Sequence, residues 1–289
     1  MTERIGWIGL GVMGLPMAGH VLKKSGSLCV WNRTPEKAKS LAEAGAQLAE
    51  SPAQLARQCS VICICVSDTP DVEQVAVGTD GIAEGVSPGS LVIDFSTISA
   101  NTTRQLAVDF REKDVDWVDA PLSGGDAGAR NAALTIMAGG TREAFNRAEP
   151  IFEYVGKSIN YMGESGSGQM TKLVNQVAVV GSIAAMSEAL VFARRLGIEP
   201  ERVLDVLKGG AAGSWSLDNY GPRLLKGNYQ PGFAARLQAK DLRLVQEAAQ
   251  SADAELPVTK LMSRLYERME REGLGGEGNH AVAKLFGWE

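Results

Sequence analysis

The sequence predicts an α/β fold, with a doubly wound parallel sheet over residues 1–163 and an all-helical domain over residues 164–289. Three observations lead to this prediction. In the first half, short apolar runs alternate with helical segments, which is typical of a parallel sheet covered on both faces. Glycines with the spacing GxGxxG follow the first apolar run directly. Beyond residue 164 the apolar residues recur only at helical spacing, so a long helix starting near Gly168 is expected to join the two domains.

The elements of the first domain follow in order along the chain. Strands are expected in the runs RIGWIGLG, SLCVWNRT, SVICICVS, GSLVIDFST, DWVDAPLSGG and ALTIMAGG. The segment MGLPMAGHVLKKSG predicts a helix that ends at Gly26, and PEKAKSLAEAGA predicts a helix with Pro35 at its start, where proline is tolerated. In the second domain, helices are expected from Gly168 to Arg195 and in PERVLDVLKGG, AKDLRLVQEAAQSA and PVTKLMSRLYERMEREG.

Composition excludes several classes of function. The 289 residues are 45% hydrophobic and 22% charged, and the formal net charge is -5, which gives no overall attraction to nucleic acid or to an anionic membrane. In the start MTERIGWIGLG the acidic Glu3 comes first and a glycine-rich turn follows early, so no secretory signal is expected. No run reaches about 18 uninterrupted apolar residues, so no membrane span is expected. These features predict a cytoplasmic protein.

The four cysteines indicate neither a metal site nor disulfides. Cys63 and Cys65 lie in the apolar run SVICICVS, where cysteine behaves as a small buried hydrophobe. The only histidines, His20 and His280, are far from them in sequence, whereas zinc needs convergent ligands. A reducing, cytoplasmic setting agrees with this pattern.

The segment GLGVMG, which spans Gly9, Leu10, Gly11, Val12, Met13 and Gly14, predicts a Rossmann-type dinucleotide site. Gly9 permits a tight turn, Gly11 lets a pyrophosphate approach the backbone, and Gly14 allows close packing of helix and strand. The N-terminus of the following helix offers free N–H groups and a positive dipole end to the phosphates. The motif is weak alone, but it directly follows a strand and opens a helix.

The end of the second strand bears on the choice of coenzyme. The segment VWNRTPEK places Asn32, Arg33 and Thr34 there, with no carboxylate before Glu36. An NAD site usually has an acidic residue at this point, whereas an NADP site has neutral and basic groups. Arg33 can pair with a 2′-phosphate in a bidentate, charge-assisted way. We therefore expect NADP(H) to be preferred and NAD(H) to be used at lower efficiency.

The polar triplet of Lys172, Asn175 and Gln176 lies in an otherwise apolar helix. Their spacing puts the three side chains on one helical face. Reduction of a carbonyl builds negative charge on oxygen and requires a proton donor, and neither histidine lies in a recognisable catalytic setting. A lysine can serve, because burial or a neighbouring charge lowers a lysine pKa toward working pH. Asn175 and Gln176 are expected to orient a substrate hydroxyl or carboxylate.

A second polar cluster lies in the segment DAPLSGG. Ser123, Gly124 and Gly125 present a hydroxyl and accessible backbone N–H groups, which suit a small carboxylate. A simple turn explains the same residues without a ligand.

Four blocks of the chain together resemble the β-hydroxyacid dehydrogenase family, also called the 3-hydroxyisobutyrate dehydrogenase family. They are IGWIGLGVMGLPMAGHVL, DAPLSGG, GSGQMTKLVNQ and KDLRLVQEAA, and they occur in the family's order over almost the whole chain. The resemblance implies that Lys172 is the general acid/base and that Ser123, Gly124, Gly125 and Asn175 hold the substrate. It places Val66 and Thr97 on the cofactor side and Lys240 near the cofactor or the closed substrate pocket. It also implies a homodimer or homotetramer formed through the helical domain.

Details within these blocks resemble two different groups of semialdehyde reductases. The Asn175–Gln176 pair and the segments IAAMSEAL and LKGGAAGS resemble tartronate semialdehyde reductases. VWNRT instead resembles the NADPH-using glyoxylate and succinic semialdehyde reductases. Trp215 and Tyr220 either line the pocket and favour a short substrate or pack between helices. His280 is expected at a helix start or on the surface rather than as a ligand.

The sequence thus predicts an NADP-dependent oxidoreductase that interconverts small β-hydroxyacids and their semialdehydes or keto acids. An imine reductase of the same architecture is the first alternative, but such enzymes usually lack a lysine at the catalytic position. A non-catalytic dinucleotide-binding protein is the second alternative, and relatives of that kind lose the lysine and carry extra modules. The site residues decide between these functions, because a fold alone does not fix a function.

Overall fold

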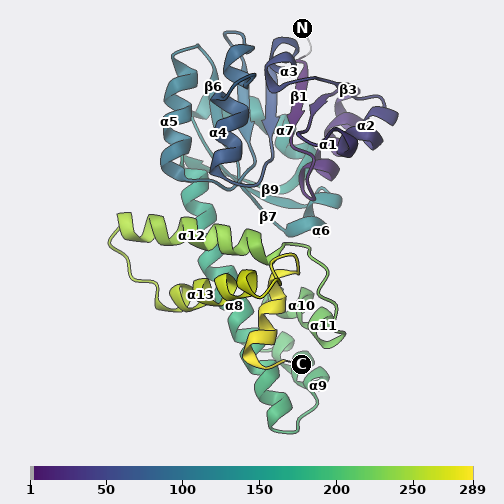
Figure 1. The fold of residues 1–289 in the computed structure, drawn as a ribbon, viewed down its shortest axis with the longest axis vertical. Helices are drawn as coiled ribbons and strands as arrows, with labels where there is room; N and C mark the ends of the chain where they lie inside the picture. Colours follow the sequence, from purple (N-terminus) through teal and green to yellow (C-terminus); the bar gives the residue numbers. More distant parts are fainter. Residues whose placement is uncertain (1–2, 289) are drawn as a thin grey trace. The chain divides into compact units, whose positions relative to one another are not determined.

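The computed structural model describes residues 3–288. The chain divides into two compact units, Met1–Lys172 and Leu173–Glu289. Figure 1 draws the first unit in purple to teal and the second in teal-green to yellow. The division falls inside one long helix, and the boundary expected between residues 163 and 164 stays a prediction.

The first unit is built on one sheet, which has nine strands within the described residues. The strand order is β3-β2-β1-β4-β5-β6-β8-β7, and β9 pairs with β8. All neighbouring strands from β3 to β6 are parallel, which is the order of a doubly wound dinucleotide-binding sheet. The strands are β1 (Ile5–Ile8), β2 (Cys29–Trp31), β3 (Gln47–Leu48), β4 (Val61–Ile64), β5 (Leu91–Asp94), β6 (Asp116–Asp119), β7 (Leu122–Ser123), β8 (Leu134–Gly139) and β9 (Gly156–Gly163).

Helices cover both faces of this sheet, because neighbouring residues of each buried strand point to opposite sides. Trp7 packs with α1 and α7 in one core cluster, whereas Ile8 packs with α3, α4 and α5 in the other. Figure 1 shows the strands between these helices. The helical segments of this unit are α1 (Gly14–Ser25), η1 (Pro35–Ala38), α2 (Lys39–Glu43), α3 (Pro52–Gln58), α4 (Thr69–Val77), η2 (Ile82–Glu84), α5 (Ala100–Arg111), α6 (Gly125–Arg130) and α7 (Arg142–Val155).

The predicted fold class is confirmed, but one edge of the sheet differs from the expected parallel arrangement. β8 runs antiparallel to β6, and β7 runs antiparallel to β8. The run DWVDAPLSGG, expected to hold a single strand, splits around Ala120 and Pro121 into β6 and β7. Proline has no N–H to donate to a ladder, so a strand interruption at Pro121 is understandable.

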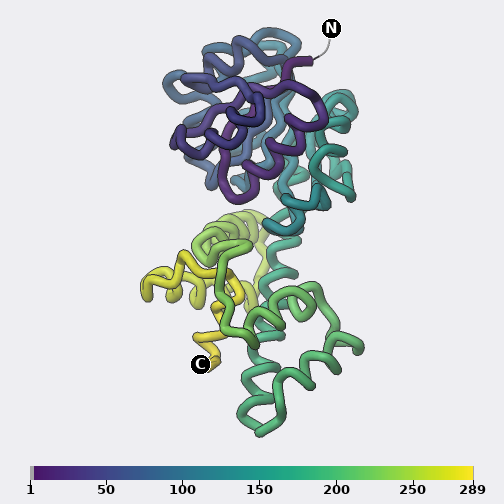
Figure 2. Tube along the Cα trace, turned by 90° about the vertical axis from the view of Figure 1, so that its right-hand side faces the viewer, coloured from purple at the N-terminus to yellow at the C-terminus, as the bar shows by residue number. Residues whose placement is uncertain are grey.

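The long helix α8 (Ser167–Arg195) starts one residue before the expected position. As far as residue 288, the second unit adds helices only, apart from an isolated bridge between Ala234 and Gly278. Its elements are α9 (Pro200–Gly209), α10 (Trp215–Asn219), α11 (Gly221–Leu225), α12 (Ala235–Ser251), α13 (Pro257–Arg271) and η3 (Asn279–Phe286). In Figure 2, α9 to α11 in green and α12 and α13 in yellow-green lie to either side of α8.

Several apolar residues of α8 belong to the core of the second unit. Val180, Ile183 and Leu190 are fully buried and share a cluster with Leu242 and Tyr266. Among the described helices α8 alone is long and apolar enough to cross a membrane by length and composition, but core helices of soluble proteins pass the same test. Part of the apolar sequence of α8 is therefore explained by its place in a core.

Candidate functional site

The glycine turn between β1 and α1 is shaped by two close backbone approaches. Gly9 has φ +95°, and a Cβ there would lie 2.2 Å from the carbonyl oxygen of Cys65. A Cβ on Gly14 would lie 2.1 Å from the carbonyl oxygen of Gly9. Gly11, in contrast, faces open space, since a Cβ built on it meets no atom within 4 Å. The turn therefore has room for a ligand beside Gly11, as a dinucleotide site requires.

The start of α1 is suited to an anion. Met13 takes the N-cap position, and no side chain caps the helix there. Val12 is 61% exposed next to it, and the first turn contains no acidic residue. The N–H of Leu15 already donates to the carbonyl of Gly11 at 3.0 Å, and Pro16 has no N–H. A phosphate would therefore be bound by the N–H groups of the turn that come before Leu15.

Asn32 and Thr34 hold the loop after β2 in place. The side-chain oxygen of Asn32 accepts a hydrogen bond from the backbone N–H of Leu10 at 2.8 Å, and its amide donates to the carbonyl of Thr34. Arg33 points outward, with 82% of its side chain exposed, and pairs with Asp71 at 2.9 Å. The sequence identified Arg33 but not this acidic neighbour, which comes from the start of α4.

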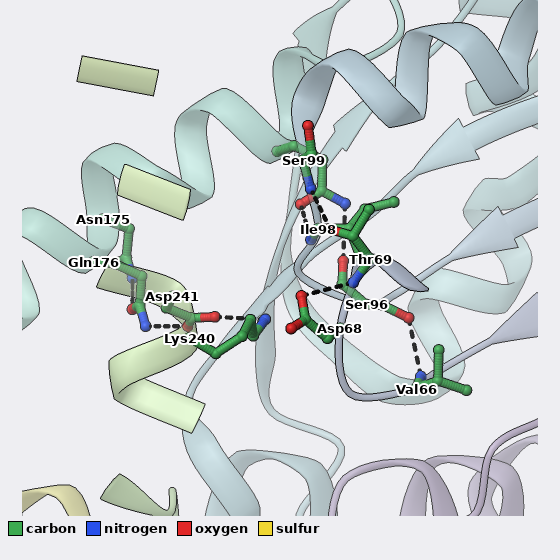
Figure 3. A network of polar contacts seen from close by, with 11 residues as sticks. Val66, Asp68, Thr69, Ser96, Ile98, Ser99, Asn175, Gln176, Lys240 and Asp241 are labelled. Atoms are coloured by element: carbon green, nitrogen blue, oxygen red, sulfur yellow. Dashed lines mark hydrogen bonds and ion pairs between the residues drawn. The ribbon is translucent and has the colours of Figure 1, made fainter. Parts of the chain in front are cut away.

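The loops after β4 and β5 are joined by hydrogen bonds, which Figure 3 shows. The backbone N–H of Val66 donates to the hydroxyl of Ser96 at 2.9 Å, and that of Ser99 donates to the hydroxyl of Thr69 at 3.1 Å. Asp68 accepts from the backbone N–H of Thr69 and so caps α4. Thr97, expected on the cofactor side, therefore lies in a loop that is fixed at both ends.

The first turn of α8 is anchored at the carboxyl end of β6 by a buried carboxylate. Asp119 accepts hydrogen bonds from the backbone N–H groups of Gly166 at 2.8 Å and Gln169 at 2.9 Å. Burial raises the pKa of the Asp119 carboxyl, and these N–H groups oppose the rise by stabilising the anion. The side chain of Gln169 reaches the loop after β5, where it donates to the carbonyl of Ser96 and accepts from the N–H of Ile98.

Lys172 follows Gln169 by one helical turn and is only 7% exposed. The helix start that carries Lys172 is thus tied to the carboxyl ends of β5 and β6. In a doubly wound sheet, this edge is where ligands bind.

The segment from Ser123 to Gly125 leads from β7 into α6. Ser123 pairs with Thr135 of β8, and Gly124 and Gly125 have φ angles of +129° and +61°. Glycine adopts such backbone angles without strain. All three residues are partly exposed, so the hydroxyl and the adjacent backbone are accessible.

In the second unit, a carboxylate links two of the predicted residues, as Figure 3 shows. Asp241 on α12 accepts a hydrogen bond from the side-chain amide of Gln176 and forms an ion pair with Lys240 at 2.7 Å. Gln176 also accepts from the amide of Asn175 at 3.2 Å. Both ends of the buried Gln176 amide are therefore engaged within the protein, whereas Asn175 is partly exposed.

Trp215 and Tyr220 meet edge to face, with ring centroids 5.1 Å apart. Their surroundings differ, because Trp215 is 51% exposed whereas Tyr220 is buried. Tyr220 stacks on His280 at 4.9 Å, and Tyr229 stacks on the same ring at 5.9 Å. His280 is thus buried at the start of η3, not on the surface, and the pKa of its imidazole is lowered, chiefly by burial.

Comparison with known proteins identifies the family. Residues 4–163 match the model for the NAD-binding domain of 6-phosphogluconate dehydrogenase, and residues 166–286 match that for the NAD-binding region of NADP-dependent 3-hydroxyisobutyrate dehydrogenase. The chain belongs to the β-hydroxyacid dehydrogenase family. It is 38% identical to the 2-hydroxy-3-oxopropionate reductase of Escherichia coli over 96% of this chain and 95% of that protein.

Two solved structures agree with the fold. A 3-hydroxyisobutyrate dehydrogenase from Salmonella typhimurium has a TM-score of 0.89 and 30% identity, and the match covers 98% of this chain and 100% of that one. The protein Psf3, solved with NADP+ and 2-OPP, has a TM-score of 0.91 and 25% identity, with 98% and 99% covered. This β-hydroxyacid dehydrogenase is therefore an oxidoreductase that binds NAD(H) or NADP(H), as its glycine turn and uncapped α1 allow.

Four residues of this dehydrogenase that the sequence analysis did not single out hold the predicted residues in place. They are Ser96, Asp119, Gln169 and Asp241. Each of the four bonds a residue that is distant in the sequence, so the spacing of residues along the chain does not indicate these contacts.

Proposed function

We propose that the chain is an NADPH-dependent reductase of small aldehyde acids, which runs reversibly toward the β-hydroxyacid. The observation that carries this proposal is the placement of Lys172. This buried lysine lies one turn after Gln169, which is bonded to the loop that follows β5. A lysine held at the ligand-binding edge of a dinucleotide-binding sheet is suited to proton transfer beside a nicotinamide.

The residues of the glycine turn and of the loops after β2, β4 and β5 would hold the coenzyme. When bound, the reduced nicotinamide supplies a hydride to the carbonyl carbon of the substrate. The ammonium of Lys172 donates a proton to the carbonyl oxygen, so that the product is an alcohol, and Lys172 then regains a proton from solvent. Ser123 and the backbone N–H groups of Gly124 and Gly125 bind the substrate carboxylate.

Asn175 is the second polar group that we assign to the substrate. Its partly exposed amide lies one turn after Lys172, and its contact with Gln176 fixes its orientation. Since the amide of Gln176 donates to Asp241, we assign Gln176 to orienting Asn175, and a direct contact of Gln176 with substrate stays a prediction. Lys240, paired with the same carboxylate, stays a predicted contact of the coenzyme.

The proposed preference for NADPH rests on Arg33. It is the cationic side chain at the end of β2, and its ion pair with Asp71 is exposed. Exposed ion pairs contribute little to stability, so a 2′-phosphate can compete with Asp71 for Arg33. The proposed substrate class follows the reductase from Escherichia coli, whose named substrate, 2-hydroxy-3-oxopropionate, is tartronate semialdehyde.

Initial rates of NADPH oxidation test this proposal with tartronate semialdehyde, succinic semialdehyde, glyoxylate and methylmalonate semialdehyde. We expect one fast substrate, and we expect Lys172→Ala to remove most of the turnover while NADPH still binds. Lys24→Ala, on the solvent-facing end of α1, is the matched control and should turn over normally. Negligible rates with all four aldehydes, or near-normal turnover of Lys172→Ala, would refute the proposal.

A further inference from the structure

We propose that Gln169 is a positioning residue that fixes the loop carrying Thr97 relative to the helical turn carrying Lys172. This inference rests on the proposed function, in which Lys172 donates the proton and Thr97 lies on the nicotinamide side. Gln169 is fully buried, and within residues 3–288 its side chain bonds the backbone on either side of Thr97.

The amide of Gln169 uses both of its ends on this loop. Its Oε1 accepts from the N–H of Ile98 at 3.1 Å, and its Nε2 donates to the carbonyl of Ser96 at 2.8 Å. A side chain must carry one donor and one acceptor on the same planar group to make both bonds. Glutamate and methionine match glutamine in length but not in this chemistry.

The backbone of Gln169 is fixed independently of its side chain. Its N–H donates to Asp119 at 2.9 Å, and the residue before it has no space for a side chain. A Cβ on Gly168 would lie 2.3 Å from the carbonyl oxygen of Met137. The backbone of Gln169 is therefore fixed relative to β6 and β8. Its side-chain amide in turn fixes the loop after β5 relative to these two strands.

The loop in turn holds the neighbouring one, because the hydroxyl of Ser96 accepts from the N–H of Val66. Lys172 lies three residues after Gln169 on the same helix, a spacing that brings side chains about 5–6 Å apart. Gln169 thereby fixes the positions of the predicted proton donor and of the two loops after β4 and β5. A misplacement of about 1 Å between reacting groups can reduce a rate by about a hundredfold.

Gln169→Met tests this role, because it removes both hydrogen bonds and keeps the length of the side chain. We expect kcat with the fastest aldehyde to fall about tenfold or more, while the Kd for NADPH changes by less than about threefold. Hydrogen exchange of the segment 96–99 in the coenzyme-free protein should become faster, since Ile98 loses its acceptor. Asn160→Ala is the matched control, since Asn160 also donates its amide to a backbone carbonyl of the first unit, that of Ile136.

Gln169→Glu gives a second test with a signature that a merely structural role does not produce. The introduced carboxyl can donate to Ser96 only when protonated, and burial next to a carbonyl raises the pKa of a carboxyl. We expect the ratio of variant to parent kcat to increase as the pH falls from about 8 to about 6.

Three results would overturn the inference. They are a normal kcat in Gln169→Met, an unchanged exchange rate at 96–99, and a loss of kcat matched by an equal loss of NADPH binding. Lys172→Ala separates this inference from the proposed function. If Lys172→Ala is inactive and Gln169→Met is normal, only the role of Gln169 fails, whereas an active Lys172→Ala refutes the proposed function itself.

Discussion

The carboxylate of Asp119 accepts a hydrogen bond from the backbone N–H of Gln169 at 2.9 Å, across 50 residues of sequence. The same carboxylate accepts from Gly166, so one side chain at the end of β6 holds the first turn of α8. The position of the predicted proton donor therefore depends on a residue that makes no proposed contact with substrate.

Asp119→Asn is expected to lower the free energy of unfolding by about 1–3 kcal/mol, because an amide presents N–H groups to one of the two buried donors. Urea unfolding followed by circular dichroism measures the change. Asp116→Asn, at the partly exposed start of the same strand, is the control and should be close to neutral. Equal losses in the two variants would show that Asp119 does not anchor the helix.

Arg33 and Asp71 should affect the choice of coenzyme in opposite directions. Arg33→Gln is expected to lower kcat/KM for NADPH about tenfold and leave that for NADH unchanged, because bonds to charged groups contribute about 1.5–3 kcal/mol. Asp71→Asn removes the negative charge that pairs with Arg33 and should increase kcat/KM for NADPH. Steady-state kinetics give kcat/KM of the parent and of each variant with both coenzymes. Equal kcat/KM of the parent with NADPH and NADH would contradict the prediction.

Replacing Trp215 should change substrate specificity, whereas replacing Tyr220 should reduce stability. Trp215 is half exposed, so Trp215→Ala is expected to change the ratio of kcat/KM between succinic and tartronate semialdehyde with little loss of stability. Tyr220 is buried against His280, so Tyr220→Ala should reduce the free energy of unfolding by about 3–5 kcal/mol, as other buried aromatic truncations do. Unchanged ratios across a series of aldehyde acids in Trp215→Ala would exclude a pocket role.

His280 should make the protein less stable in acid. Its folded-state pKa lies below the unfolded value of about 6.5, so the unfolded chain binds the proton more readily. The free energy of unfolding is therefore highest above about pH 6.5 and decreases as the pH falls toward the folded-state pKa.

Urea unfolding at a series of pH values tests this dependence. His280→Gln keeps a donor for the carbonyl of Asn228, which the imidazole contacts at 2.8 Å, but does not titrate, so the acid decrease should become smaller. His20→Gln, on the partly exposed face of α1, is the matched control. An identical acid decrease in the parent and in His280→Gln would show that another group is responsible.

Much of the fold could be predicted from local sequence. The buried strands β1, β4 and β5 are continuous apolar runs, and Gly26 ends α1 with a φ angle of +76° as expected. β3 and β7 have two residues each, too few to show a period. β9 has mostly exposed or partly exposed residues, so it lacks the apolar run of a buried strand.

The candidate site could be predicted only where a motif is local. The glycine turn and the Lys172 segment are contiguous in sequence, and their geometry follows from a strand, a turn and a helix. The roles of Asp119, Gln169 and Asp241 depend on contacts made over tens of residues. The burial of His280 between two tyrosines likewise arises from tertiary packing, which no pattern around residue 280 indicates.

The anchoring of α8 on Asp119 bears on how this chain can be cut and recombined. A fragment that stops at Gly163, where the sheet ends, would leave the Asp119 carboxylate without the two N–H groups that it accepts in the intact protein. A fragment that continues past Lys172 keeps both of these hydrogen bonds. Chimaeras that exchange the helical half between relatives should therefore place the crossover inside α8, beyond its second turn. The end of β6 and the first turn of α8 then come from the same parent.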